Sequence, residues 1–306
     1  MATPTFLKPG TRPDPVPVEP PFIPRILWQT TRDRHRIPPK LAACMDRLKA
    51  TNPGWEHRLF DDESQLAFLR GVCSDRFLQA YARIQRRYGA ARADLFRYVA
   101  VYMHGGAYLD LKSGTTRPLD DILRPDDRYI LSQWDNGPDG MFPGVGAHRK
   151  HRDVPGSEYE QWFIIAAPGH PYLAAVLEHV LDNMDRYNPF TASNGGKAVL
   201  EMMGPIAYTR AIHRIRMQHP HRMISAWTDG VRYTMFGDLE AHRSLDAMHY
   251  LRGETPVLGH TGLTGTGQWR YRMLAAAYRP VATLRAWNVR RLARLRAGRS
   301  GTRQPD

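Results

Sequence analysis

The sequence predicts an α/β fold in which a sheet carries helices on both faces, and two observations lead to this prediction. Short apolar stretches typical of buried parallel strands alternate with longer helical stretches along the chain. The chain has 306 residues, of which 42% are hydrophobic, enough to build the core of one large domain. Since no run of about 18 apolar residues occurs, no membrane-spanning helix is predicted.

The alternation begins after a proline-rich start. Residues 22–30 are short and continuously apolar, which predicts the first strand. A helix is predicted over 39–50, with proline in its first turn, and the Asn-Pro-Gly sequence at 52–54 ends it. A second strand at 55–60 and a helix around residues 66–69 complete a strand–helix–strand–helix series.

The stretch from Ala90 to Pro118 carries the strongest functional signal. Asp94 and Arg97 are three residues apart, so they share one face of a predicted helix. Apolar residues surround this pair, which indicates a mostly buried helix and favours a ligand-facing role over a surface ion pair. Gly105 and Gly106 then supply the permissive backbone that ends a helix and reverses the chain.

The next strand is predicted at 107–111 and places Asp110 near its carboxyl end. Ligands of open α/β sheets bind at that edge of the sheet. We therefore expect Asp94, Arg97 and Asp110 to converge across the Gly-Gly turn. The alternative for Asp110 is that its carboxylate only caps the following turn.

The remaining elements follow the same rhythm. Residues 133–157 are rich in glycine, proline and charge and predict a long loop of the kind that forms lids or acceptor-binding elements. The other predicted elements are a helical turn at 118–122, strands at 128–132 and 161–167, helices at 171–183 and 204–212, and a final loop at 260–269.

The segment RADLFRYVAVYMHGGAYLDLKS, residues 92–113, resembles the sugar-transferase signature of glycosyltransferase family 32. The segment IPRILWQ at 23–29 is similar to the start of the nucleotide-binding half of that family. The resemblance implies a GT-A type fold with a mixed, mostly parallel sheet. It also implies transfer of a sugar from a UDP- or GDP-sugar to a hydroxyl of a glycan or lipid-linked saccharide, with retention of the donor's anomeric configuration and assistance from a divalent cation.

The resemblance also implies roles for individual residues. Asp110 would hold Mn²⁺ or Mg²⁺, hard cations that prefer carboxylate oxygens. Asp94 would accept hydrogen bonds from sugar hydroxyls, and Arg97 would donate to sugar or phosphate oxygens. His260 is a candidate second metal ligand, although a lone histidine is more often a hydrogen-bonded structural residue. Further predictions at the donor are Trp28, Gln29 and Thr30 at the base and ribose, Lys112 and Trp269 near the phosphates, and Gly106 as a further donor-binding residue.

Lys112 departs from the family pattern, which often has a second acid at this position. A protonated lysine cannot ligate a metal. Three interpretations remain: Lys112 binds a phosphate directly, it points to solvent while Asp110 and another residue hold the ion, or the site is impaired. We expect the second.

The predicted loop at 133–157 contains no clear acceptor signature. His148 and His151 have a metal-ligand spacing but lie among cations, so a phosphate-bearing acceptor or a plain solvated loop is the better interpretation. Asp153, Glu158 and Glu160 flank this loop and are candidates to assist an acceptor hydroxyl. The sequence does not choose among them.

The two ends of the chain are predicted to lie outside the glycosyltransferase domain, which we place at 22–280. Residues 1–21 predict a proline-rich flexible tail without a secretory signal. Residues 281–306 predict a basic amphipathic segment, either a contact with an anionic membrane or a helix docked on its own domain. With Cys44 and Cys73 as its two cysteines, the chain is expected in the cytoplasm, at the inner membrane surface.

Two other functions compete with the enzyme. The net charge of +13 also suits a nucleic-acid-binding protein, but the apolar, glycine-punctuated signature argues against exposed basic and aromatic residues, so no nucleic acid is expected. Lys112 motivates a catalytically silent binder of sugar nucleotides. Both remain alternatives to the transferase.

Overall fold

The computed structural model describes residues 4–188, 192–236 and 255–259, together with Trp269, Met273 and Ala276. Within these residues the chain builds a six-stranded sheet with the strand order β2-β1-β3-β6-β5-β7. In that order the strands are Glu56–Phe60, Ile26–Thr30, Gly106–Leu109, Phe163–Ala166, Tyr129–Ser132 and Arg222–Ile224.

The sheet is mixed and mostly parallel. Strand β1 is parallel to β2 and β3, and β5 is parallel to β7, whereas β6 runs antiparallel to both β3 and β5. A small second sheet pairs β4 (Gly114–Thr115) with β8 (Val231–Arg232) in antiparallel fashion. The predicted α/β class is confirmed, including the mixed sheet.

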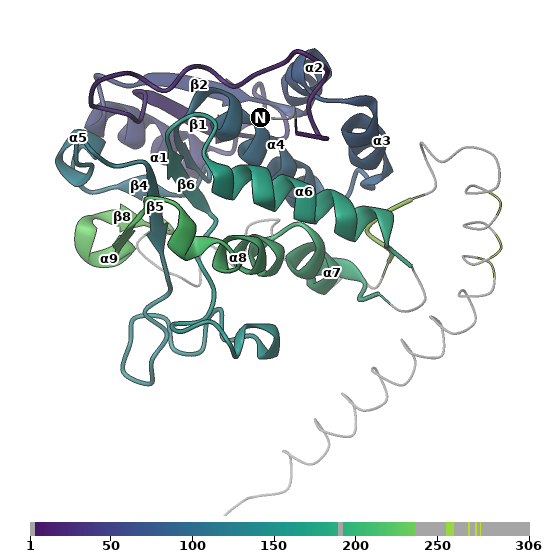
Figure 1. Cartoon of the computed structure of the whole chain (residues 1–306). Helices are drawn as coiled ribbons and strands as arrows, with labels where there is room; N and C mark the ends of the chain where they lie inside the picture. The colour runs from purple at the N-terminus through teal and green to yellow at the C-terminus, as the bar shows by residue number, and fades with distance from the viewer. Residues whose placement is uncertain are drawn as a thin grey trace, which may run out of the picture.

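Helices cover both faces of the sheet, as predicted (Figure 1). On one face, Trp28 and Tyr108 join the larger hydrophobic core, and on the other, Leu27 and Ala107 join a smaller one. The larger core includes α2 (Asp62–Val72), α3 (Asp75–Arg83), α4 (Gly89–His104), α6 (Pro171–Asp185), α7 (Gly195–Met202) and α8 (Pro205–His213). The smaller core includes α1 (Pro39–Thr51), α5 (Leu119–Ile122) and α9 (Ala226–Asp229).

Helix α4 is the central helix of the larger core, and its exit fixes the geometry of the site. It ends at Gly105, whose φ is +67°, and Gly106 follows with a φ of +96°. A side chain at Gly105 would collide with Pro24 and Pro168, and one at Gly106 would collide with the Ile26 carbonyl. Only glycine therefore lets α4 turn directly into β3 beside β1.

The N-terminal segment differs from the predicted flexible tail. Phe6 and Leu7 are buried in the larger core, and Leu7 bridges to Cys73. Further along, Asp14 accepts a 2.8 Å hydrogen bond from His104. Burial of these two apolar side chains removes their surface from water and so helps to dock this proline-rich segment on the domain.

Several other predicted elements can be compared with the structure. Residues 133–157 form the predicted long loop, a teal projection below β5 in Figure 1 that contains one 3₁₀ turn at Arg149–His151. Helices α3 and α7 and strand β7 were not predicted. The predicted basic amphipathic segment, 281–306, lies outside the described residues. None of the described helices is both long and apolar enough to span a membrane.

Candidate active site

A cavity of about 650 Å³ opens at the carboxyl ends of β1 and β3. This volume lies in the range of about 300–1,000 Å³ that is typical of small-molecule sites. Its walls come from the end of β1, the start of α4, the residues after β3, the 133–162 region and helices α7 and α8. The sheet edge that the sequence predicts for ligand binding is therefore hollowed.

Three side chains meet at the floor of this cavity, and we call them the charged cluster: Asp94, Arg97 and Asp110. Arg97 Nη2 lies 3.0 Å from Asp94 Oδ1 and 3.3 Å from Asp110 Oδ1. Asp94 and Arg97 are 5% and 4% exposed, and the Asp110 side chain is 25% exposed. The predicted convergence of these residues across the Gly-Gly turn is confirmed.

Gln161, just before β6, locks the charged cluster in place. Arg97 Nη1 donates to the Gln161 backbone oxygen at 2.8 Å and to its Oε1 at 2.7 Å. Gln161 Nε2 in turn donates to Asp94 Oδ1 at 3.1 Å. The guanidinium also stacks over the Tyr108 ring, 4.5 Å from its centroid. A buried ion pair persists only when its remaining hydrogen-bonding groups are satisfied in this way.

The environment of the charged cluster changes its protonation. Burial raises the pKa of Asp94 to about 6, although Arg97 and the Gln161 hydrogen bond favour its ionised form. Burial opposes the charge on Arg97, but Tyr108, Asp110 and Asp94 overcome it and raise the pKa of this guanidinium further. Asp94 is thus a carboxylate whose charge is lost in mildly acidic solution.

Lys112 also lies in the cavity wall. Its Nζ is 4.0 Å from Asp110 Oδ2 and 4.0 Å from the centroid of the Tyr233 ring. The side chain is 18% exposed. The expectation that Lys112 points to solvent is wrong, because the Tyr233 ring and the Asp110 carboxylate hold its ammonium group over the cavity.

The cavity also has an aromatic wall, formed by Trp134, Trp162 and Tyr233. Their ring centroids lie 5.1–6.4 Å apart. Glu158, also lining the cavity, accepts hydrogen bonds from Trp134 Nε1 at 3.0 Å and His148 Nε2 at 2.9 Å. Flat apolar rings next to a carboxylate suit the alternating apolar and hydroxyl faces of a sugar.

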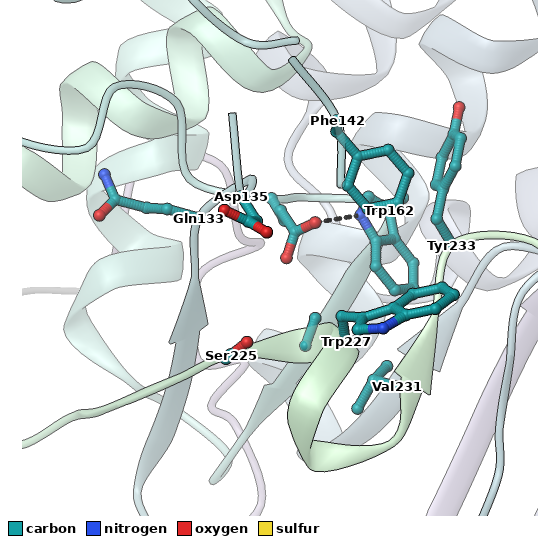
Figure 2. A pocket seen from close by; sticks show the side chains of 10 residues that line it. Gln133, Asp135, Phe142, Trp162, Ser225, Trp227, Val231 and Tyr233 are labelled. Atoms are coloured by element: carbon teal, nitrogen blue, oxygen red, sulfur yellow. Dashed lines mark hydrogen bonds between the residues drawn. The ribbon is translucent and has the colours of Figure 1, made fainter. Parts of the chain in front are cut away.

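A second, much smaller cavity adjoins the first and shares Trp162 and Tyr233 with it. Figure 2 shows this cavity, with the Trp162 indole donating to Glu160 Oε1, a bond of 3.2 Å. Burial raises the pKa of Glu160 to about 7. Of the acidic candidates beside the loop, Glu158 therefore faces the large cavity and Glu160 the small one, whereas Asp153 lines neither.

Residues 38–129 match the family described as the glycosyltransferase sugar-binding region containing a DXD motif. The match covers 92 of the 306 residues of the chain. The match spans the charged cluster and the Gly-Gly turn. This match and the mixed, mostly parallel sheet agree with the predicted GT-A type of fold.

The chain is also similar to mannosyltransferases of yeasts. It is 27% identical over 200 residues to the initiation-specific alpha-1,6-mannosyltransferase of Schizosaccharomyces pombe, covering 62% of this chain and 48% of that protein. It is 36% identical over 103 residues to inositol phosphoceramide mannosyltransferase 3 of the same yeast, covering 33% and 27%. The chain thus spans about half or less of these relatives' length.

Among solved structures, the glycosyltransferase PaToxG matches with a TM-score of 0.46 and 14% sequence identity, over 86% of this chain and 88% of that one. A likeness at this level is too distant to carry an argument about the site.

The metal-binding part of the family motif is altered here. The DXD sequence is replaced by Asp110-Leu111-Lys112, and the Asp110 carboxylate already lies between two cations, Arg97 and Lys112. Within the described part of the chain, no group of three His, Cys, Asp or Glu side chains is placed to hold a metal ion. His260 lies outside the described residues. The two cations beside Asp110 disfavour a divalent ion at this carboxylate, because like charges repel.

The residues predicted at the end of β1 divide into lining and supporting side chains. Thr30 lines the cavity, and its hydroxyl is 2.9 Å from the Tyr108 hydroxyl. Gln29 is fully buried and bonds His57 at 2.9 Å. Trp28 is buried in the larger core and donates to the Gly105 oxygen at 2.9 Å. The prediction that Trp28 and Gln29 line the donor pocket is wrong, because both side chains support the strand from within the protein.

The remaining donor predictions lie away from the cavity. Gly106 serves the turn between α4 and β3 and does not line the cavity. Trp269 is 64% exposed and is not part of the cavity wall. The predicted donor-binding roles of these two residues stay predictions.

Arg32 and Arg87 also line the cavity, and sequence reasoning missed them. Both are exposed at its rim, one after β1 and the other just before α4. Arginines at a cavity mouth attract anionic ligands and bind phosphate oxygens. The Arg86-Arg87 pair immediately before the predicted helix was the available signal for this rim.

Proposed function

We propose that this protein is a hexosyltransferase that moves a sugar from a nucleotide-sugar donor to a hydroxyl of a glycan or lipid-linked saccharide. The observation that carries the proposal is the charged cluster at the floor of a 650 Å³ cavity, inside the region that matches the glycosyltransferase family. The relatives' names favour mannose as the first sugar to test, from GDP-mannose, with UDP-sugars beside it.

The proposed reaction breaks the bond between the anomeric carbon and the diphosphate, and the electron pair leaves with the diphosphate oxygen. The acceptor hydroxyl oxygen forms the new bond, and its proton passes to the leaving phosphate. Asp94 holds sugar hydroxyls by accepting their hydrogen bonds, and Arg97 fixes that carboxylate and faces the developing charge. Retention of configuration follows from the family resemblance and is part of the proposal.

The acceptor approaches along the aromatic wall in this proposal. Trp134 and Tyr233 offer faces for an acceptor sugar ring, and Glu158 offers a carboxylate for its hydroxyls. The relatives' names include both a chain-initiating mannosyltransferase and an inositol phosphoceramide mannosyltransferase. Free oligosaccharides and inositol-bearing lipids are therefore the two acceptor classes to compare.

The place of the reaction is proposed on charge alone. The basic segment at 281–306 suits a peripheral contact with an anionic membrane, which would bring the cavity near a lipid-linked acceptor on the cytoplasmic side. Vesicle co-sedimentation of the full chain and of a chain ending at residue 280 tests this contact.

The test of the function uses the purified chain with a panel of GDP- and UDP-hexoses and both acceptor classes. We expect nucleotide release and a product one hexose heavier with one donor, and loss of both in Asp94→Asn. The exposed Asp126→Asn is the matched control. Nucleotide binding without turnover for every acceptor supports the silent binder. Salt-sensitive RNA or DNA binding without any nucleotide-sugar binding would sink the proposal.

A further inference from the structure

We propose that this transferase stabilises the leaving diphosphate with the side chains of Lys112 and Arg97 instead of a divalent cation. The inference rests on the proposed function and deepens it. Its starting point is the replacement of the second acid of the DXD motif by Lys112, together with the position that the structure gives this lysine.

The first step is that Lys112 is placed where a motif-bound cation would act. It follows Asp110 by two residues, and its Nζ lies 4.0 Å from Asp110 Oδ2. The side chain lines the same cavity as Asp94 and Arg97. One positive charge thus already stands beside the carboxylate that the motif offers to a metal.

The second step is that the structure holds Lys112 in this position. The Tyr233 ring packs against its ammonium group at 4.0 Å from the ring centroid, and Met235 N donates to the Lys112 backbone oxygen at 2.9 Å. The neighbouring Ser113 Oγ donates to the backbone oxygen of Tyr233 at 2.7 Å. Because both backbone and ring are fixed, little side-chain freedom remains to be lost when a phosphate binds.

The third step concerns the oxygens of Asp110. Asp110 Oδ1 pairs with Arg97 Nη2 at 3.3 Å and accepts a hydrogen bond from the Tyr108 hydroxyl at 3.2 Å. Asp110 Oδ2 lies next to the Lys112 ammonium group. A divalent ion bound to Asp110 would lie within a few ångströms of two cationic side chains, and this repulsion weakens its binding. Asp110 is better suited to orient Lys112 and Arg97 than to hold a metal.

The fourth step is the charge that the donor brings. A nucleotide sugar carries a negatively charged diphosphate, and that charge grows on the leaving oxygen as the glycosidic bond breaks. Lys112 and Arg97 face the cavity from its floor, and Arg32 and Arg87 stand at its rim. These fixed cations supply the charge that DXD enzymes obtain from a metal, and no proton has to leave Lys112 during the transfer.

The experiment compares the metal dependence of the wild type with three variants at one position. In metal-free buffer with EDTA, we expect nucleotide release by the wild type within about two-fold of that with added Mn²⁺. We expect Lys112→Ala to lose at least about ten-fold in both conditions, and Lys112→Arg to keep turnover in EDTA within about five-fold. Lys112→Asp restores the DXD spacing and should require Mn²⁺. Lys49→Ala, at the exposed end of α1, is the control.

Calorimetric binding of GDP and UDP gives a second readout that does not depend on turnover. We expect wild-type affinity in EDTA to match that with Mn²⁺, and Lys112→Ala to bind more weakly in both, with each variant's thermal unfolding as the folding check. Wild-type turnover or binding that EDTA removes and Mn²⁺ restores overturns the inference while the proposed function stands. Wild-type turnover by Lys112→Ala in EDTA overturns it as well. No turnover and no nucleotide binding in any condition overturns the proposed function itself.

Discussion

The charged cluster and the aromatic wall line one cavity and are built in opposite ways. The charged cluster comes from α4 and the end of β3, is mostly buried, and each of its charges lies within 3.3 Å of an opposite charge. The aromatic wall comes from a glycine- and proline-rich loop and from chain segments about 100 residues apart. The charged cluster is therefore a set of side chains held by one another, whereas the aromatic wall is a surface to which separate chain segments contribute.

This difference assigns the chemistry of the proposed enzyme to the charged cluster and its choice of acceptor to the aromatic wall. A rigid, buried cluster holds the part of the donor shared by every turnover. Loops on a rigid scaffold vary more readily, so they suit recognition of the acceptor. Changes in the charged cluster should therefore affect folding and turnover together, whereas changes in the two tryptophans of the aromatic wall should affect acceptor binding alone.

The largest effect is expected from Arg97→Met. Removing the guanidinium leaves Asp94 and Asp110 as neighbouring carboxylates without their shared cation. Breaking a buried ion pair costs about 3–5 kcal/mol of unfolding free energy, and turnover should be abolished. Urea unfolding and nucleotide release measure the two losses. Arg36→Ala breaks an exposed pair and should cost under about 1 kcal/mol. A similar small loss for Arg97→Met would contradict the role of the cluster.

The next effect is expected from Asp94→Asn, which keeps the shape of the side chain and removes its charge. Because the carboxylate holds sugar hydroxyls in the proposed complex, kcat/KM should fall by about 10²–10³-fold. Burial raises the pKa of Asp94 to about 6, so wild-type turnover should decline as the pH falls through 6, where the carboxylate gains a proton. The variant's residual activity should lack this decline. A pH profile with the same acidic limb in both proteins would assign the titration to another group.

The charged cluster also shows how much the sequence alone reveals. Asp94, Arg97 and Asp110 lie within 17 residues, so helix periodicity and the Gly-Gly turn predict that they converge. The sheet class follows from the strand–helix alternation for the same local reason. Lys112 was misplaced because its position depends on Tyr233, 121 residues away, and no local pattern reports such a contact.

Burial of single strand residues was harder to predict. Trp28 and Gln29 share a strand end with Thr30, but the register of β1 against β3 and the side chains of α2 and α4 decide which of them reaches the cavity. The aromatic wall was not predicted at all, because its members come from three distant segments. Glu158 was named as one of several acids, and only the fold separates it from Glu160 and Asp153.

A smaller effect is expected from Trp134→Ala, which removes one ring of the aromatic wall. Loss of one stacking face should raise the KM for the acceptor by about ten-fold, while the KM for the donor stays within about two-fold. Steady-state kinetics with each substrate varied in turn separate these constants. Trp227→Ala is the matched control, because Trp227 lines the small cavity and not the large one. A rise in donor KM would place the donor, not the acceptor, on this wall.

The smallest effect is expected from the ion pair of His148 with Glu158. The hydrogen bond to Glu158 raises the pKa of His148 above its usual value of about 6.5. Because the folded-state pKa is the higher one, the pair's stabilisation is fully present below the unfolded-state pKa and is lost as the pH rises through the folded one.

Unfolding free energies of the wild type and His148→Gln should therefore differ by at most about 1 kcal/mol at pH 6, since the histidine is partly exposed. The difference should shrink toward pH 9, and the exposed His35→Gln should show none at either pH. Urea unfolding of the three proteins at several pH values measures these differences in unfolding free energy. A difference that grows with pH would mean that Glu158 favours the neutral imidazole. The ion pair would then not hold the loop beside the aromatic wall.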